Sequence, residues 1–149
     1  MLQQTQVTTV IPYFERFLNR FPDIEELSKS DLNEVLGLWS GLGYYARARN
    51  IHKTARLIVS EFGSRFPHNL DLLMQLPGIG RSTAGAILSI SMNIPAPILD
   101  GNVKRVLTRF HTIKGYPEKS EIKKKLWEVA ESHTPNTQFQ KYTQAIMDL

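Results

Sequence analysis

The sequence predicts an all-α protein, a helical bundle that contains one helix-hairpin-helix motif. Apolar residues recur at steps of three and four along most of the chain, which is the period of an α-helix. Glycine, proline and capping residues separate these stretches at short intervals, as expected for helices joined by short loops. No segment combines sustained apolar and polar alternation with the turn chemistry of a hairpin, so we expect no sheet.

The size and composition of the chain predict a single domain. Its 149 residues are 42% hydrophobic and 21% charged, which suffices for one core and is short for two. Cysteine is absent, which excludes disulfides, cysteine-ligated zinc and a thiol nucleophile within these residues and favours a reducing compartment. The net charge of +4 and the pI near 9.4 are mild evidence for a polyanionic partner.

We expect neither a secretory signal nor a membrane span. Met1 is followed by LQQTQVTT, which lacks the basic and apolar segments of a signal peptide. The longest uncharged stretch, residues 82–99, contains Gly85, Asn93 and two prolines and falls short of the roughly 20 apolar residues that a span needs. The sequence therefore predicts a protein without a membrane partner.

The first half of the chain predicts three helices. An apolar stripe along residues 7–18 marks the first, and Pro22 breaks its run. Ser30 is expected to cap a short helix over residues 31–39. A longer helix is expected to follow over residues 44–62.

Gly63 supplies the stop of this longer helix. Its inward face is expected to carry Ala46, Ile51, Ala55, Ile58, Val59 and Phe62. Its outward face is expected to carry Arg47, Arg49, Lys53 and Arg56.

The second half of the chain predicts five shorter helical segments. They span residues 69–76, 81–92, 100–110, 119–133 and 136–149. Asn69 is expected to cap the first of them and Ser120 the fourth.

The turn before residue 81 has the chemistry of a phosphate site. Gly78 and Gly80 permit positive φ and leave backbone N–H groups uncovered at the start of a helix, where an anion is favoured. Arg81 is a cation at the positive end of that helix, which suggests an anion nearby. The small residues after Arg81 permit close packing against a neighbour. The alternative is a plain αα-hairpin with a glycine cap.

Five motifs together carry a resemblance to a known family. MLQQTQV, GLGYYARARN, LPGIGRSTA, ILDGNVKRVLTR and QAIMDL occur in this order along essentially the whole chain. In this respect the chain resembles the adenine DNA glycosylases of the MutY type, in the helix-hairpin-helix DNA glycosylase superfamily. The resemblance implies the six-helix core of that fold as one domain over residues 1–149, truncated at both ends, with the helix-hairpin-helix at about 69–90.

The resemblance also implies a reaction. The family removes adenine mispaired with 8-oxoguanine or guanine by hydrolysing its N-glycosidic bond, which begins base excision repair. The related endonuclease III type carries a lysine where this chain has Ser82, and a serine cannot form a Schiff base. The resemblance therefore implies a monofunctional glycosylase.

Asp100 is the candidate catalytic residue. By position alone it is an ordinary helix N-cap. In the resembled family the matching aspartate stabilises the oxocarbenium-like sugar and helps to position the attacking water, as carboxylates do in glycoside cleavage. The family's general acid is a glutamate just before MLQQTQ, outside these residues, and neither Glu15 nor Glu25 matches its position. The 149 residues alone are therefore expected not to release adenine at the full rate.

The resemblance implies two further groups of site residues. The adenine pocket is expected to contain Leu2, Val7, Ser82 and Gln144. The residues expected to contact DNA are Gln4, Leu42, Tyr44, Gly78, Gly80, Arg81 and Lys104. Without the resemblance, Gln4 and Gln144 would be surface residues of helices, and Leu42 and Tyr44 core residues.

No metal is assigned to the four histidines, which are scattered without ligand spacing. The resemblance implies a 4Fe-4S cluster in full-length family members, held by cysteines beyond Leu149. It also implies a monomer that binds double-stranded DNA with an A:8-oxoG or A:G mismatch in the bacterial cytoplasm, associated with the nucleoid.

Two other functions stay open. One is a non-catalytic helix-hairpin-helix DNA-binding module, and the other is a helical interaction domain without a role on nucleic acid. Salt-dependent binding to duplex DNA would separate the second from the rest.

Overall fold

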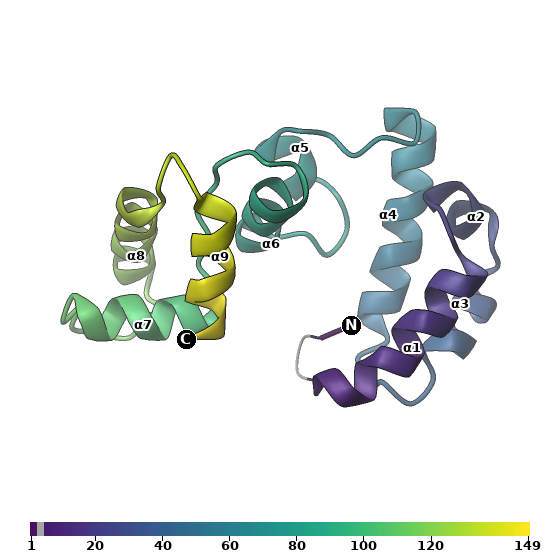
Figure 1. The fold of residues 1–149 in the computed structure, drawn as a ribbon, viewed down its shortest axis with the longest axis horizontal. Helices are drawn as coiled ribbons and strands as arrows, with labels where there is room; N and C mark the ends of the chain where they lie inside the picture. Colours follow the sequence, from purple (N-terminus) through teal and green to yellow (C-terminus); the bar gives the residue numbers. More distant parts are fainter. Residues whose placement is uncertain (3–4) are drawn as a thin grey trace. The chain divides into compact units, whose positions relative to one another are not determined.

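The computed structural model describes residues 1–2 and 5–149, and the regular structure of these residues is helical throughout (Figure 1). The elements are α1 (Val7–Arg20), α2 (Ile24–Lys29), α3 (Leu32–Trp39), α4 (Ala46–Phe62), α5 (Leu70–Met74), α6 (Arg81–Ala86), the π-helical segment η1 (Ile87–Ser91), α7 (Gly101–Phe110), α8 (Ser120–His133) and α9 (Phe139–Asp148). The predicted all-α class is confirmed. Within the described residues, no helix is both long enough and apolar enough to cross a bilayer.

The chain forms two compact units. The first comprises Met1–Pro67 and Gln75–Gly78, and the second comprises His68–Met74 and Ile79–Leu149. The expected single domain stays a prediction.

The core of the first unit forms around Trp39, which is fully buried. The ring of Phe17 meets Trp39 edge-on at 6.1 Å and Phe21 at 5.1 Å, so α1, the turn after it and α3 share one aromatic cluster. Only part of the apolar stripe of α1 reaches this core. Val10 and Phe17 are buried, whereas four other members of the stripe are 45% to 60% exposed: Val7, Ile11, Phe14 and Leu18.

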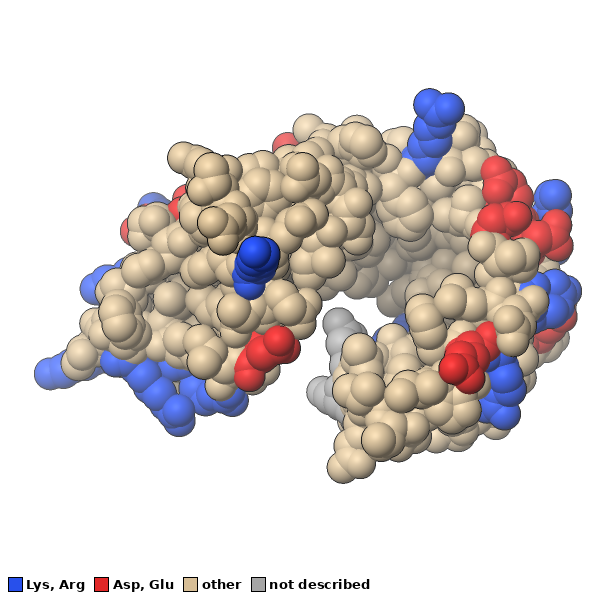
Figure 2. Space-filling view, viewed as in Figure 1, with Lys and Arg blue, Asp and Glu red and all other residues tan. Residues whose placement is uncertain are grey.

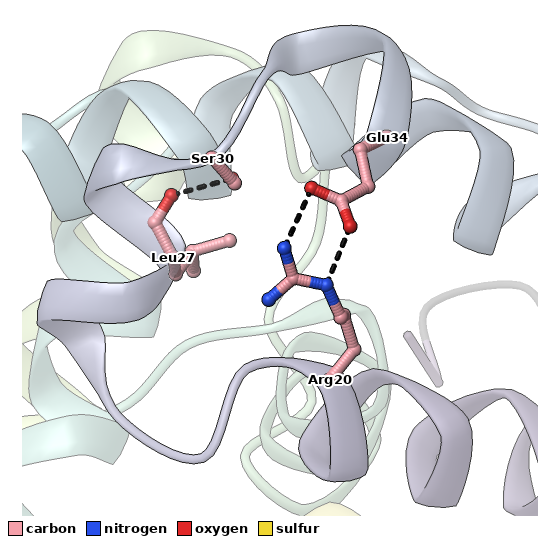
Figure 3. A network of polar contacts seen from close by, with 4 residues as sticks. All are labelled: Arg20, Leu27, Ser30 and Glu34. Carbon is pink, nitrogen blue, oxygen red and sulfur yellow. Dashed lines mark hydrogen bonds and ion pairs between the residues drawn. The ribbon is translucent and has the colours of Figure 1, made fainter.

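The junction of α2 and α3 corrects one predicted cap. The Ser30 hydroxyl donates to the Leu27 carbonyl at 2.7 Å and therefore closes α2 (Figure 3). Asp31 caps α3 instead, because its carboxylate accepts from the Asn33 N–H at 2.7 Å. In the same region the Arg20 guanidinium makes a two-pronged bond to Glu34, at 2.5 and 2.9 Å, and joins the end of α1 to α3 (Figure 3).

Helix α4 is rotated relative to the predicted face. Ala55 and Ile58 are buried as expected, but Ala46 is exposed because the helix begins there. His52 is also buried. Its Nε2 lies 3.0 Å from the Ser30 carbonyl oxygen, so the buried ring has a hydrogen-bond partner. The predicted outward position of Arg47 is also wrong. Its Nη1 donates to the Met1 carbonyl at 2.8 Å, and its guanidinium lies 5.5 Å from the Trp39 ring.

The core of the second unit packs α7, α8 and α9 around the segment that precedes α7. Its buried members are Ile98, Leu99, Val103, Leu107, Ile113, Leu126, Trp127, Ala130 and Ile146. The side chain of Asn69 caps α5 as predicted, accepting from the N–H groups of Asp71 and Leu72. Ser120 does not cap α8. It is the first helical residue, and the N-cap is Lys119, whose backbone is extended and whose side chain makes no capping bond.

Candidate active site

Asp100 occupies the N-cap of α7. Its Oδ1 accepts a hydrogen bond from the Val103 N–H at 2.8 Å, and its carbonyl accepts the Lys104 N–H at 2.9 Å. The predicted cap is confirmed. Within the described part of the chain, Oδ2 accepts no hydrogen bond. One oxygen therefore fixes the half-buried carboxylate, and the other is available to a substrate.

Ser82 lies beside the segment that carries Asp100. Its Oγ accepts a hydrogen bond from the Leu99 N–H at 3.0 Å, which joins the first turn of α6 to the residue before the aspartate. One turn later, Gly85 packs directly against the Pro97 carbonyl oxygen, where a Cβ would clash with backbone. The close packing predicted for the small residues of α6 is therefore confirmed at Gly85. It sets the position of the segment that carries Asp100.

The two glycines of the hairpin turn differ in conformation. Gly78 has φ +79°, and a Cβ there would lie 2.7 Å from the Asn50 Nδ2. The Thr54 hydroxyl donates to the Pro77 carbonyl at 3.1 Å and holds the same part of the turn on α4. Gly80 has φ −88°, so only Gly78 uses the positive φ that glycine permits in this turn.

The contribution of Gly80 is the space in front of α6. It is the N-cap of that helix, it offers no side-chain bond, and a Cβ added to it would meet nothing within 4 Å. The first helical bond of α6 runs from the Ala84 N–H to the Gly80 carbonyl at 2.8 Å. The N–H groups of the three residues before Ala84 therefore lie at the start of α6, where no capping side chain covers them.

Arg81 finds its anion within the chain. Its guanidinium lies 4.0 Å from the centroid of the Trp127 ring and pairs with the Glu131 carboxylate on α8. The unfavourable placement of this cation at a helix start predicted an anion nearby, and Glu131 is such an anion. The Arg81 side chain is therefore held on α8 rather than in front of the turn.

Lys104 lies one turn after Asp100 and is also paired. Its Nζ is 2.5 Å from the Glu118 Oε1, and only 19% of its side chain is exposed. The hydrogen bond from Lys104, and then its positive charge, hold the pKa of the Glu118 carboxyl below its ordinary value. Lysine and arginine side chains gather along α7 on the face shown in Figure 2.

Helix α9 presents Gln144 and is anchored by the residue before it. The Gln144 amide donates to both carboxylate oxygens of Asp148, each at 3.2 Å. Thr143 is buried, and its hydroxyl lies 2.8 Å from that of Ser89 in η1. Sequence reasoning missed this pair, because serine and threonine within a helix commonly lie on its exposed face.

The predicted site residues fall in both units. Leu2, Val7 and Tyr44 of the first unit are 57%, 60% and 63% exposed, whereas Leu42 is 6% exposed, which favours its alternative as a core leucine. Tyr44 also has φ +49°, a left-handed conformation uncommon for a residue with a side chain. Gln4 lies outside the described residues. In the second unit, the structure brings Ser82 beside the segment that ends in Asp100.

Comparisons with known proteins identify a family and similar sequences. The model of the HhH-GPD superfamily base excision DNA repair proteins matches residues 1–132. An adenine DNA glycosylase of Buchnera aphidicola (Schizaphis graminum) is 53% identical over 149 residues, which are 100% of this chain and 43% of that protein. The human adenine DNA glycosylase is 41% identical over 150 residues, covering 100% of this chain and 28% of that protein. The chain thus spans less than half the length of these relatives.

Two solved structures share the fold. A thermostable thymine-DNA glycosylase superposes with a TM-score of 0.87 at 26% identity, over 99% of this chain and 68% of that one. Endonuclease III in a non-covalent DNA complex superposes with a TM-score of 0.77 at 25% identity, over 97% of this chain and 65% of that one. The family match over residues 1–132, together with these likenesses, shows that the chain belongs to the HhH-GPD superfamily of base excision DNA repair proteins.

Proposed function

We propose that this chain is the core of a DNA glycosylase that hydrolyses the N-glycosidic bond of adenine mispaired with 8-oxoguanine or guanine. The observation that carries the proposal is the Asp100 carboxylate, fixed by its Oδ1 at the start of α7 and next to the Ser82 contact. Relatives that match the whole length of this chain are named adenine DNA glycosylases.

The chemistry follows from the carboxylate. As the glycosidic bond breaks, the sugar gains positive charge, and a fixed carboxylate opposite it stabilises that charge. Oδ2 of Asp100 is the oxygen available for this task and for orienting the attacking water. Ser82 offers a hydroxyl rather than an amine, so it supplies no Schiff-base route to strand cleavage.

Binding of DNA is proposed at two places. The uncovered N–H groups at the start of α6 suit a phosphate, with Gly78 and Gly80 shaping the turn and the Arg81 side chain held on α8. The exposed Tyr44 ring suits insertion near the mismatch. For Gln4 and for the buried Leu42, contact with DNA is proposed from the resemblance alone. The resemblance assigns four residues to binding of the flipped adenine, Leu2 and Val7 in the first unit and Ser82 and Gln144 in the second. Extruding a base costs a few kcal/mol.

The 4Fe-4S cluster that the resemblance implies for full-length family members is proposed to have its ligands outside these residues. The sequence contains no cysteine, and the described residues contain no cluster of three or more His, Cys, Asp or Glu that would hold a metal ion. No step of the proposed reaction depends on the cluster.

The proposed reaction needs a second carboxyl group that protonates the departing base. The resemblance places this acid upstream of Met1. We therefore propose that the 149 residues alone bind mismatched DNA and release adenine slowly. In this form they behave like the alternative, a non-catalytic helix-hairpin-helix module.

A single-turnover assay tests the proposal. The chain is compared with a version extended upstream by the segment that precedes the matched region in the Buchnera relative, using duplex with adenine opposite 8-oxoguanine. The extended version is expected to release adenine, and Asp100→Asn is expected to slow release by about a hundredfold or more. Equal rates for Asp100→Asn and the unchanged extended chain would refute the assignment of Asp100, and duplex binding without salt dependence would refute the DNA interface.

A further inference from the structure

Two histidines that are 22 positions apart in the sequence meet at the carboxyl ends of α7 and α8. His111 directly follows α7, and His133 is the last residue of α8. Their Nε2 atoms are 2.7 Å apart, and their ring centroids are 4.9 Å apart. Both histidines are exposed residues.

The contact between the two rings already brings both Nε2 atoms together. One Nε2 donates a proton and the other accepts it, so the two nitrogens point toward each other across that proton. When the donor ring carries its proton on Nδ1 instead, both Nε2 atoms have a lone pair for a divalent transition metal, and no proton has to leave the neutral pair. Imidazole nitrogen is the ligand that Zn²⁺, Cu²⁺ and Ni²⁺ share.

The spacing of the nitrogens discriminates between these metals. With metal–nitrogen bonds of about 2.0 Å, two ligands lie roughly 2.8 Å apart at a right angle and roughly 3.3 Å apart at a tetrahedral angle. The observed 2.7 Å is nearer to the right-angle value. Right angles are typical of tetragonal Cu²⁺ and Ni²⁺. To reach this geometry, the two exposed rings need to separate by about 0.1 Å and to turn until both lone pairs converge on the metal.

The surroundings favour a bound cation. The Phe110 ring meets both imidazoles edge-on, with centroids at 5.1 Å from His111 and 6.2 Å from His133, so the two histidines share an aromatic neighbour. Both rings also lie at helix carboxyl ends, where the helix dipole attracts positive charge. The described residues offer no third His, Cys, Asp or Glu to the site, so water completes the coordination.

From this geometry we propose that His111 and His133 form a bidentate surface site for a divalent transition metal, with Cu²⁺ and Ni²⁺ preferred over Zn²⁺. The bound ion joins the ends of α7 and α8. The site is independent of the proposed glycosylase chemistry.

Thermal unfolding with NiCl₂, CuCl₂ or ZnCl₂, on protein prepared without a histidine tag, tests this proposal. A metal that binds only the folded state raises Tm as its concentration rises. We expect Ni²⁺ and Cu²⁺ to raise Tm reversibly with EDTA, and His111→Gln or His133→Gln to weaken metal affinity by roughly tenfold or more. His68→Gln removes another exposed histidine and is expected to keep the full effect.

A spectroscopic measurement keeps the test independent of variant stability. In the unmodified protein, substoichiometric Cu²⁺ is expected to broaden the ring NMR signals of His111 and His133 before those of His68, and its EPR spectrum is expected to show two equatorial nitrogens. The proposal is overturned if either single substitution leaves the dependence of Tm on metal concentration unchanged, if the metals produce no shift, or if broadening begins at His68.

Discussion

The Ser82 hydroxyl accepts a hydrogen bond from the backbone N–H of Leu99, 3.0 Å away, and this bond joins α6 to the residue that precedes the catalytic candidate. The donor is a backbone group in the buried part of the second unit, since Leu99 is 4% exposed. The same serine that removes the Schiff-base route therefore also positions the segment carrying Asp100.

Ser82→Ala is expected to lower the free energy of unfolding by about 1–3 kcal/mol, because it leaves a buried N–H without a partner. Urea denaturation measures this change. Ser132→Ala is the matched control, since its exposed hydroxyl bonds only the Val129 carbonyl of its own helix, and a loss below about 0.5 kcal/mol is expected. Equal losses for the two variants would show that the Leu99 contact does not stabilise the fold.

The Ser89 and Thr143 hydroxyls form a buried pair that anchors α9 on η1. Ser89→Ala and Thr143→Val are each expected to destabilise the protein by about 1–3 kcal/mol, since each leaves one buried hydroxyl unpaired. The double variant is expected to lose clearly less than the sum of the two single losses. A double-mutant cycle from denaturation curves checks this coupling, and strict additivity would contradict it.

The pKa of Glu118 should report whether Lys104 stays in its ion pair in solution. The Lys104 hydrogen bond is the main cause of the lowered pKa, and Lys123 lowers the same pKa by a smaller charge effect. We expect Lys104→Met to return the Glu118 pKa to its ordinary range in a carboxyl NMR titration, and Lys123→Met to raise it less. An unchanged pKa in Lys104→Met would mean that the pair is absent.

The same pair gives a sign for the dependence of stability on pH. The folded pKa of Glu118 is lower than its unfolded pKa, so its contribution to stability is present above the unfolded value and is lost as pH falls through the folded value. Acid unfolding of Lys104→Met should therefore lack this contribution. Because the Glu118 side chain is half exposed, the difference is expected to shrink with added salt.

Local signals in the sequence predicted most of the fold. The Asp100 cap, the Asn69 cap and the Gly63 stop each depend on one residue and its immediate neighbours, and each is present in the structure. The cap predicted for Ser30 is wrong because Asp31 follows it directly. Both residues can cap the start of α3, and in the structure Asp31 does so. The inward position predicted for Ala46 is wrong for another reason. The apolar period predicts which face of a helix is buried, but it does not predict at which residue the core ends.

Contacts between distant residues could not be predicted in the same way. His111 and His133 are 22 positions apart, and Arg81 and Glu131 are 50 positions apart, so no local pattern records either pair. The sequence does predict that Arg81 has an anion nearby, because a cation is unfavourable at the start of a helix. It does not predict that this anion is Glu131, because that pairing depends on where the fold places α8.

The Arg81 and Glu131 pair leads to a prediction about DNA binding. Because the guanidinium lies on Trp127 and Glu131, we expect the turn to hold phosphate through backbone N–H groups alone. Arg81→Met should then lower the free energy of unfolding by about 1 kcal/mol, through the lost ring and ion contacts. It should leave the slope of log affinity against log salt for duplex DNA unchanged.

Glu131→Gln provides the comparison for this prediction. It removes the ion pair, keeps the Trp127 contact and is expected to increase DNA affinity slightly at low salt, because one negative charge is gone and the guanidinium is less tightly held. If Arg81 instead reaches a phosphate in the complex, the salt slope of Arg81→Met will fall by about 0.9. Binding of duplex DNA at several salt concentrations therefore decides whether Arg81 supports the fold or contacts the phosphate.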